Sequence, residues 1–185
     1  CRRRPLCRRL RHRGSPPLFG TPKRIGFYNR DYPIKASWSF RRYSAFIEKM
    51  ARKKIKIQNR DILGIFPRTF TAVEASIAKA AERTKDGVTA WVCAADHQAY
   101  DLIEGFMGHD LTVPIDVSIT GFDGIVQKKH KSPLTTIEIP FRAIGATGAE
   151  RLNNRIRNRF GGRQNIYISG RLVKGKTTTP PRQAS

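Results

Sequence analysis

Residues 89–107 read TAWVCAADHQAYDLIEGFM, and this stretch decides the fold. Its first six residues, Thr89–Ala94, are almost all apolar, as is typical of a strand covered on both faces of a sheet. Asp96 then stands where its side chain can cap a helix, and Gly108 stands where that helix would end in a left-handed turn. The stretch therefore predicts a central β-strand that leads directly into an α-helix.

The same alternation continues toward the amino terminus. The pattern predicts strands at Ile25–Tyr28 and Ile62–Phe66. The first is followed by a helix over 38–52, whose apolar residues recur every three or four positions. The second is followed by a helix from Thr71 to about Arg83, in which Thr71 and Glu74 fit a capping box. Each strand thus precedes a helix.

The alternation also continues toward the carboxyl terminus. The expected elements are strands at 117–122 and 134–139, a helix within 140–160, and a last strand made of 166–168 and 172–173. The apolar period of this helix predicts that one face points inward. That face consists of Ile144, Gly148, Leu152 and Ile156.

Four strand-to-helix steps without two-residue hairpin signals imply right-handed crossovers and a parallel sheet with helices on both faces. The expected fold class is therefore α/β, doubly wound. Ligands of such sheets lie outside the carboxyl ends of the strands. Arg42, Phe70 and Asp123 would converge at that edge. A guanidinium, an aromatic ring and a carboxylate suit a polyhydroxylated or heterocyclic small molecule.

The chain is strongly basic. Its 185 residues include 36 Lys and Arg against 14 Asp and Glu, which gives a net charge of +22. Seven arginines fall in the first fourteen residues, and we expect residues 1–22 to be a disordered basic head and 179–185 a loose tail. This charge makes a nucleic-acid-binding protein the alternative function, although charge alone predicts salt-sensitive binding without sequence recognition.

Other classes of protein find less support in the sequence. No run approaches the roughly 20 apolar residues of a membrane span, so we expect a cytoplasmic protein without membrane association. The spacing of Cys1, Cys7 and Cys93 suits neither a disulfide framework nor, with the four histidines, a zinc site. Because GxSxG and GxGxxG motifs are missing, we expect no catalysis and no cofactor.

Several blocks of sequence resemble one known family. They are KRIGF (23–27), RYSAF (42–46), TAWVCAADHQAY (89–100), LTVPIDVSITGFD (111–123), SPLTTIEIP (132–140) and GRLVKGKTT (170–178). In order and spacing they are similar to the effector-binding domain of the lactose and galactose repressor family of bacterial transcription regulators. That domain shares its fold with periplasmic sugar-binding proteins. The resemblance covers about residues 23–178.

The resemblance implies a division of this chain. Residues 23–133 would form most of the carboxyl-terminal lobe of a two-lobed sensor, and 134–160 a crossover and a helix of the other lobe. Residues 161–178 would return as a strand. The family's DNA-binding helix-turn-helix is missing from this chain. The implied partners are a small sugar-like effector in an interlobe cleft, operator DNA, and a second subunit of a homodimeric parent. A stand-alone sugar-binding protein is a further alternative.

The resemblance also implies ligand-binding residues. Arg42 corresponds to the family's arginine that binds ligand hydroxyls or carboxylate, Asp123 to the aspartate of its GFD motif, and Phe70 to its stacking aromatic ring. Ala95 stands where many members have a sugar-binding asparagine, a departure that argues against a simple hexose. Trp38 stands near the sequence position at which sugar-binding members of the family carry a small polar residue. An indole there would narrow the pocket or add a stacking face.

Overall fold

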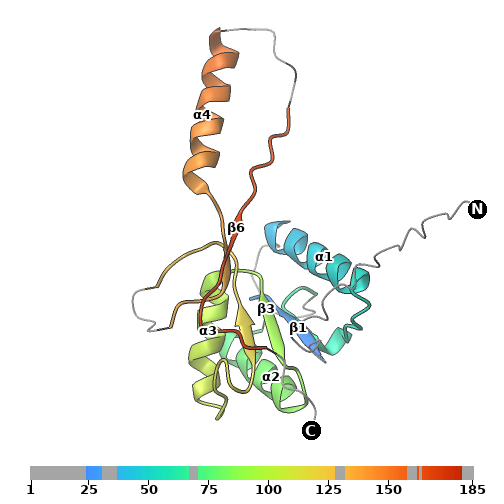
Figure 1. Cartoon of the computed structure of the whole chain (residues 1–185). Coiled ribbons are helices and arrows are strands. Elements are labelled where there is room, and N and C mark those ends of the chain that lie inside the picture. Colours follow the sequence, from blue (N-terminus) through green and yellow to red (C-terminus); the bar gives the residue numbers. More distant parts are fainter. Residues whose placement is uncertain are drawn as a thin grey trace, which may run out of the picture.

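A computed structural model of the protein describes residues 24–30, 37–66, 71–127, 132–157, 162 and 164–180. Strands and helices alternate along the chain (Figure 1). In order they are β1 (Ile25–Tyr28), α1 (Ser37–Arg52), a 3₁₀ turn (Asn59–Asp61), β2 (Ile62–Leu63), α2 (Val73–Lys85), β3 (Ala90–Cys93), α3 (Asp96–Met107), β4 (Ser118–Thr120), β5 (Thr136–Glu138), α4 (Phe141–Arg157) and β6 (Arg171–Val173).

The main sheet has the strand order β2-β1-β3-β4, and all of its strand pairs are parallel. The central position predicted for residues 89–94 is confirmed, because β3 lies between β1 and β4. Its register sets Gly26 opposite Trp91. A Cβ atom on Gly26 would lie 2.4 Å from the Trp91 ring, so glycine here makes room for the indole.

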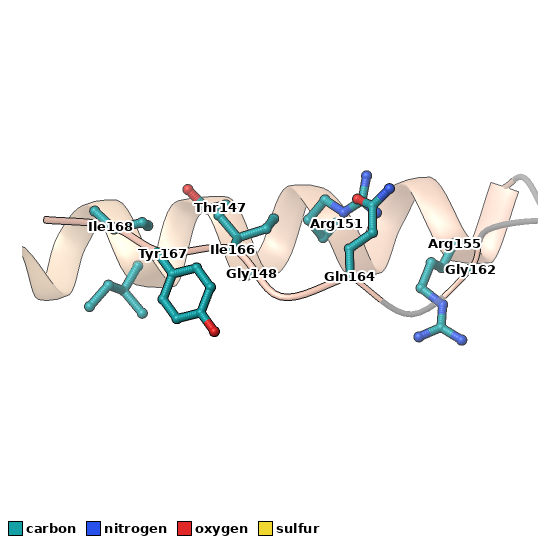
Figure 2. Close-up of a pocket in the computed structure, with 10 residues that line it drawn as sticks. Thr147, Gly148, Arg151, Arg155, Gly162, Gln164, Ile166, Tyr167 and Ile168 are labelled. Carbon is teal, nitrogen blue, oxygen red and sulfur yellow. The ribbon is translucent and has the colours of Figure 1, made fainter. Parts of the chain in front are cut away.

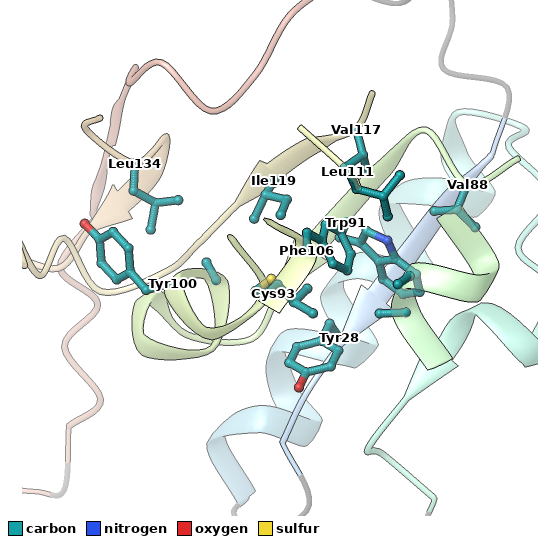
Figure 3. Close-up of a cluster of buried hydrophobic side chains, with 14 residues drawn as sticks. Tyr28, Val88, Trp91, Cys93, Tyr100, Phe106, Leu111, Val117, Ile119 and Leu134 are labelled. Atoms are coloured by element: carbon teal, nitrogen blue, oxygen red, sulfur yellow. The ribbon is translucent and has the colours of Figure 1, made fainter. Parts of the chain in front are cut away.

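Helices cover both faces of this sheet, as expected of a doubly wound fold. On one face Trp91 and Cys93 of β3 pack with residues of α2 and α3, including Phe106, in the larger cluster of buried side chains (Figure 3). On the other face Phe27 packs against Phe46 of α1. The alternation of side chains along buried strands produces this arrangement, and the α/β class predicted from the sequence is confirmed.

The carboxyl-terminal part departs from this layered body. β5 and β6 form a separate antiparallel pair, and α4 with the segment that returns from it extends away from the main sheet (Figure 1). The predicted inward face of α4 is wrong for the described chain, because no residue of this helix is buried. Its period correctly marks an apolar face, but none of the described elements covers that face.

Three predicted helix caps are also wrong. Gly108 ends α3 with a φ angle of −75°, so the predicted left-handed turn does not form there. α2 begins at Val73, and its N-cap residue is Ala72 instead of the predicted Thr71. α3 has Ala95 as its N-cap. Asp96 is the first helical residue, and its carboxylate accepts hydrogen bonds from other elements instead.

The predicted ends of the chain are tested only in part. Residues 1–22 and 181–185 lie outside the described residues. Thr177 and Thr179 lie beside β4 and are hydrogen-bonded to it. The backbone N–H of Ile119 donates to the Thr177 carbonyl at 2.8 Å, and the Thr179 N–H donates to the Ser118 hydroxyl at 3.1 Å. The expected loose tail is therefore wrong at Thr179. In the described ranges, no helix is long and apolar enough to cross a lipid bilayer.

Candidate functional site at the carboxyl edge of the sheet

Arg42 connects the carboxyl ends of two neighbouring strands. It lies in the second turn of α1, and its guanidinium donates from Nη1 to the Ala94 carbonyl at 2.5 Å, directly after β3. Nη2 donates to Oδ1 of Asp123 at 2.8 Å, three residues after β4. The Arg42 and Asp123 side chains are 20% and 15% exposed, so this ion pair is largely but not fully withdrawn from water.

Two aromatic rings flank the Arg42 guanidinium. Its Cζ atom lies 4.0 Å from the centroid of the Phe122 ring and 4.7 Å from that of Trp38. Both distances are within the range of cation–π attraction. Because rings and hydrogen bonds fix the guanidinium together, its remaining N–H donors are held in place for a ligand. The Trp38 ring stays partly accessible, since this residue is 36% exposed.

The backbone of Asp123 is strained. Its φ angle is +133°, in a region that residues with a Cβ atom rarely adopt. The crossover segment holds it there: the Asp123 N–H donates to the Ile137 carbonyl at 2.9 Å, and the Ile139 N–H donates to the Asp123 carbonyl at 3.1 Å. Strain of this kind is concentrated at binding sites, where surrounding structure fixes one side-chain direction. The crossover thus sets the direction of this carboxylate.

Asp96 joins the same crossover to α3. Its carboxylate is fully buried and accepts 2.6 Å hydrogen bonds from the Thr136 hydroxyl and from the Ile125 N–H. Burial raises the pKa of Asp96, while these two donors oppose the shift. A Cβ atom added to Gly121 would clash with Oδ1 of Asp96, so the backbone at Gly121 packs directly against this carboxylate.

A second ion pair lies at the same edge of the sheet. Arg30, two residues after β1, donates to Asp101 of α3 at 2.7 Å. His97 lies one helical turn before Asp101, and its pKa is lowered by burial and by the positive charge of Arg30. The buried Asn29 accepts a hydrogen bond from Gln98 at 3.2 Å. These contacts fix the end of β1 against the start of α3.

The structure brings together three of the five predicted site residues. Arg42, Asp123 and Trp38 form one cluster, and Arg42 also reaches the carbonyl next to Ala95. Ala95 itself is buried at the N-cap of α3 and offers a methyl group rather than a hydrogen-bonding side chain. Phe70 lies outside the described residues. Its predicted stacking role stays a prediction.

Sequence reasoning missed two features of this edge. Phe122 stacks on Arg42, and its place beside Asp123 in the GFD motif was the available signal. The pairing of Arg30 with Asp101 had no sequence signal, because 71 positions separate these residues. Among the residues that the structure describes, no three His, Cys, Asp or Glu side chains gather as a metal site would require.

Comparison with known proteins identifies the family. Residues 22–178 match the family of periplasmic binding protein-like domains. The HTH-type transcriptional repressor PurR of Photobacterium profundum is 34% identical over 137 residues, which are 74% of this chain and 40% of that repressor. The chain thus spans less than half the length of this curated relative.

Solved structures show the same fold. A LacI family transcriptional regulator from Enterococcus faecium with bound ribose superposes with a TM-score of 0.69 at 24% identity, over 86% of this chain and 58% of that one. A complex of the transcriptional regulator CelR with cellobiose has a TM-score of 0.69 at 20% identity, over 84% of this chain and 46% of that one. These identities support the fold alone. The family match over residues 22–178 shows that this chain belongs to the periplasmic binding protein-like domains.

Proposed function

We propose that this chain binds a small sugar-like effector at the Arg42–Asp123 pair and senses it for a DNA-binding transcriptional repressor. The observation that carries the proposal is the fixed guanidinium of Arg42, held by Ala94 and Asp123 and flanked by Trp38. A guanidinium and a carboxylate side by side offer donors and acceptors at once, which suits the hydroxyl groups of a polyol.

The aromatic residues supply the other half of sugar recognition. The partly exposed Trp38 ring offers a flat apolar surface to the C–H groups of a sugar ring. Phe70 would add a second such face. Ala95 provides no amide group, which favours ligands other than the simple hexoses. The ribose and cellobiose bound in the two similar regulators support a carbohydrate, and purines remain the second chemical class to test.

The proposed wider role follows from the family. Residues 23–133 would be one lobe of the sensor, and the crossover and α4 would belong to the other. Operator DNA would be bound by a helix-turn-helix outside this chain, in a homodimeric cytoplasmic parent. Among the described residues, the site has an ion pair but no nucleophile with a positioned base, and binding is the activity that we propose.

Nuclear magnetic resonance titration tests the ligand site. We expect ribose or another pentose, hexose, polyol or purine to shift the Trp38 indole and Arg42 Nε signals. The Trp91 indole is an internal control, because it is buried and donates to Thr84 at 2.9 Å. We expect weak binding, with dissociation constants above a micromolar, because one lobe supplies half of a cleft and cannot exclude water by closing.

Two variants make this test specific. Arg42→Ala should abolish the ligand-dependent shifts, whereas Lys79→Ala, an exposed change on α2, should leave them intact. The proposal fails if no compound of these classes moves the Trp38 and Arg42 signals at millimolar concentration. It also fails if Arg42→Ala binds the ligand as tightly as the unaltered chain.

A further inference from the structure

A basic surface lies at the amino edge of the main sheet. Arg42, near the start of α1, reaches the carboxyl edge, and the chain after α1 leads into the amino end of β2 at Ile62. Asp86 pairs there with both Arg60 and Arg24, the residue directly before β1. The open groove beside α4 (Figure 2) lies away from this surface, because α4 extends beyond the carboxyl edge (Figure 1).

The basic surface carries more positive charge than its acidic neighbours neutralise. All of its basic side chains are exposed, and they are Lys49, Arg52, Lys53, Lys54, Lys56 and Arg60. Arg52 pairs with Glu48, and Arg60 pairs with Asp86 at 3.1 Å. Within the described ranges, none of the ion pairs involves the lysines of this surface. Their charges therefore face water without a neutralising carboxylate.

The fold holds the backbone of these lysines in place. Ile55 and Ile57 pack against the buried cluster beneath α1, and the lysines that alternate with them, Lys54 and Lys56, are exposed. The Ile55 N–H donates to the Met50 carbonyl at 3.0 Å, which closes the end of α1. Lys54 has a φ of +57° in this turn, where glycine is the favoured residue. A cationic side chain thus stands where the backbone alone favours none.

Helix stability accounts for only part of this charge. Cations in the last turn of a helix interact favourably with its dipole, which explains Lys49 and Arg52. Lys56 and Arg60 lie beyond α1, where this effect has faded. Lys49 and Lys53 are four positions apart, a spacing at which like charges repel each other on a helix. The charge of this surface therefore suits an external anion better than it suits the fold.

We propose that the basic surface binds the phosphate backbone of duplex DNA, separately from residues 1–22. Between residues 49 and 60 no large apolar side chain is exposed. A protein partner or a lipid surface would need such apolar anchors, whereas phosphates are bound by cations and polar groups alone. The exposed Gln58 and Asn59 add amide groups of that kind. A duplex is favoured over a single strand, because each phosphate contact releases more counterions from it.

The salt dependence of DNA binding by the full chain tests this proposal. Fluorescence anisotropy with a duplex of arbitrary sequence gives the slope of log K against log salt concentration. Removing the four lysine charges should reduce the magnitude of that slope by about 3 to 4, since each phosphate contact contributes about 0.9. This variant carries K49Q, K53Q, K54Q and K56Q. The matched control removes four exposed charges elsewhere, through K79Q, R142Q, K174Q and K176Q. Equal changes of slope in the two variants would overturn the proposal.

Nuclear magnetic resonance locates the bound duplex. We expect the backbone amide signals of residues 53–60 to shift when the duplex is added and to return at high salt. Polyglutamate and vesicles that contain phosphatidylserine, each at the same concentration of negative charge, are the competing anions. Equal shifts with either one, or duplex-induced shifts confined to residues 1–22, would overturn the proposal. The sugar titration is independent of this result, because it monitors Trp38 and Arg42 at the carboxyl edge.

Discussion

Asp96 joins the segments that surround the candidate site. It accepts hydrogen bonds from the loop after β4 and from β5, and so connects α3 to both segments that position Asp123. Burial alone would disfavour the charged carboxylate, and it raises the pKa of this group. The two donors offset part of that cost only while both bonds are made.

Asp96→Asn should therefore destabilise the fold. The new amide cannot accept from both Thr136 and Ile125, so at least one buried donor loses its partner, at a cost of about 1–3 kcal/mol. Urea denaturation followed by circular dichroism measures this loss. Asp110→Asn is the matched control, because Asp110 is exposed and its φ of +58° is one that asparagine tolerates. Equal stability of the two variants would contradict the role given to Asp96.

The lowered pKa of His97 predicts how the free energy of unfolding changes with pH. Its pKa is lowered in the fold, so between the folded pKa and the ordinary value of about 6.5 the unfolded chain binds more protons. The stability due to His97 is thus complete above the ordinary pKa and is lost as the pH falls below it. His97→Gln should reduce the loss of stability on acidification, measured by urea denaturation on both sides of that pKa. An unchanged loss would refute this assignment.

At the residue scale, the sequence predicts groups that follow strand ends. Arg42 and Asp123 are predicted to lie at one sheet edge because parallel strands end on the same side. In the structure, Nη2 of Arg42 lies 2.8 Å from Oδ1 of Asp123. The role of Asp96 was not predictable in this way. An aspartate before a helix suggests capping, and only the folded chain brings Thr136, 40 positions away, to its carboxylate.

At the scale of elements, the predicted strands and helices are mostly confirmed because their hydrophobic periods differ. The helix predicted over 38–52 forms at Ser37–Arg52, and the strand predicted at Ile25–Tyr28 has the same bounds. The period of α4 shows that it has an apolar face, but not which element covers it. A strand predicted at Ile166–Ile168 likewise has β composition without a partner, and pairing is a tertiary property.

Because α4 packs against little else, its stability should follow intrinsic helix propensity. Gly145→Ala places a Cβ atom with no other atom within 4 Å, so it should stabilise α4 by about 1 kcal/mol. Hydrogen exchange of the α4 amides should slow by about fivefold. Gly26→Ala is the opposite case, because its Cβ atom would clash with Trp91 and lower the free energy of unfolding. Unchanged exchange in Gly145→Ala would show that tertiary contacts control α4.

At the scale of the whole molecule, charge and fold lead to different partners. The net charge of +22 favours any polyanion, whereas the proposed ligand site is a neutralised Arg42–Asp123 pair suited to an uncharged ligand. Composition alone therefore suggests nucleic acid, and the proposed sensor role rests on the sequence blocks that resemble the repressor family. The two properties coexist because the most concentrated charge lies in residues 1–14, outside the segment that matches the family.

We expect this chain to adhere to DNA without recognising an operator sequence. Seven arginines in the first fourteen residues can release counterions from any phosphate backbone. None of the helices in the described ranges has a proposed role in reading base edges in the major groove. Retention on DNA should fall steeply with salt and drop on removal of residues 1–18, while the sugar-dependent Trp38 signal persists. Assays on an operator-like palindrome and a scrambled duplex complete the test. A preference above about tenfold, equivalent to about 1.4 kcal/mol, would reveal a DNA-reading element within this chain.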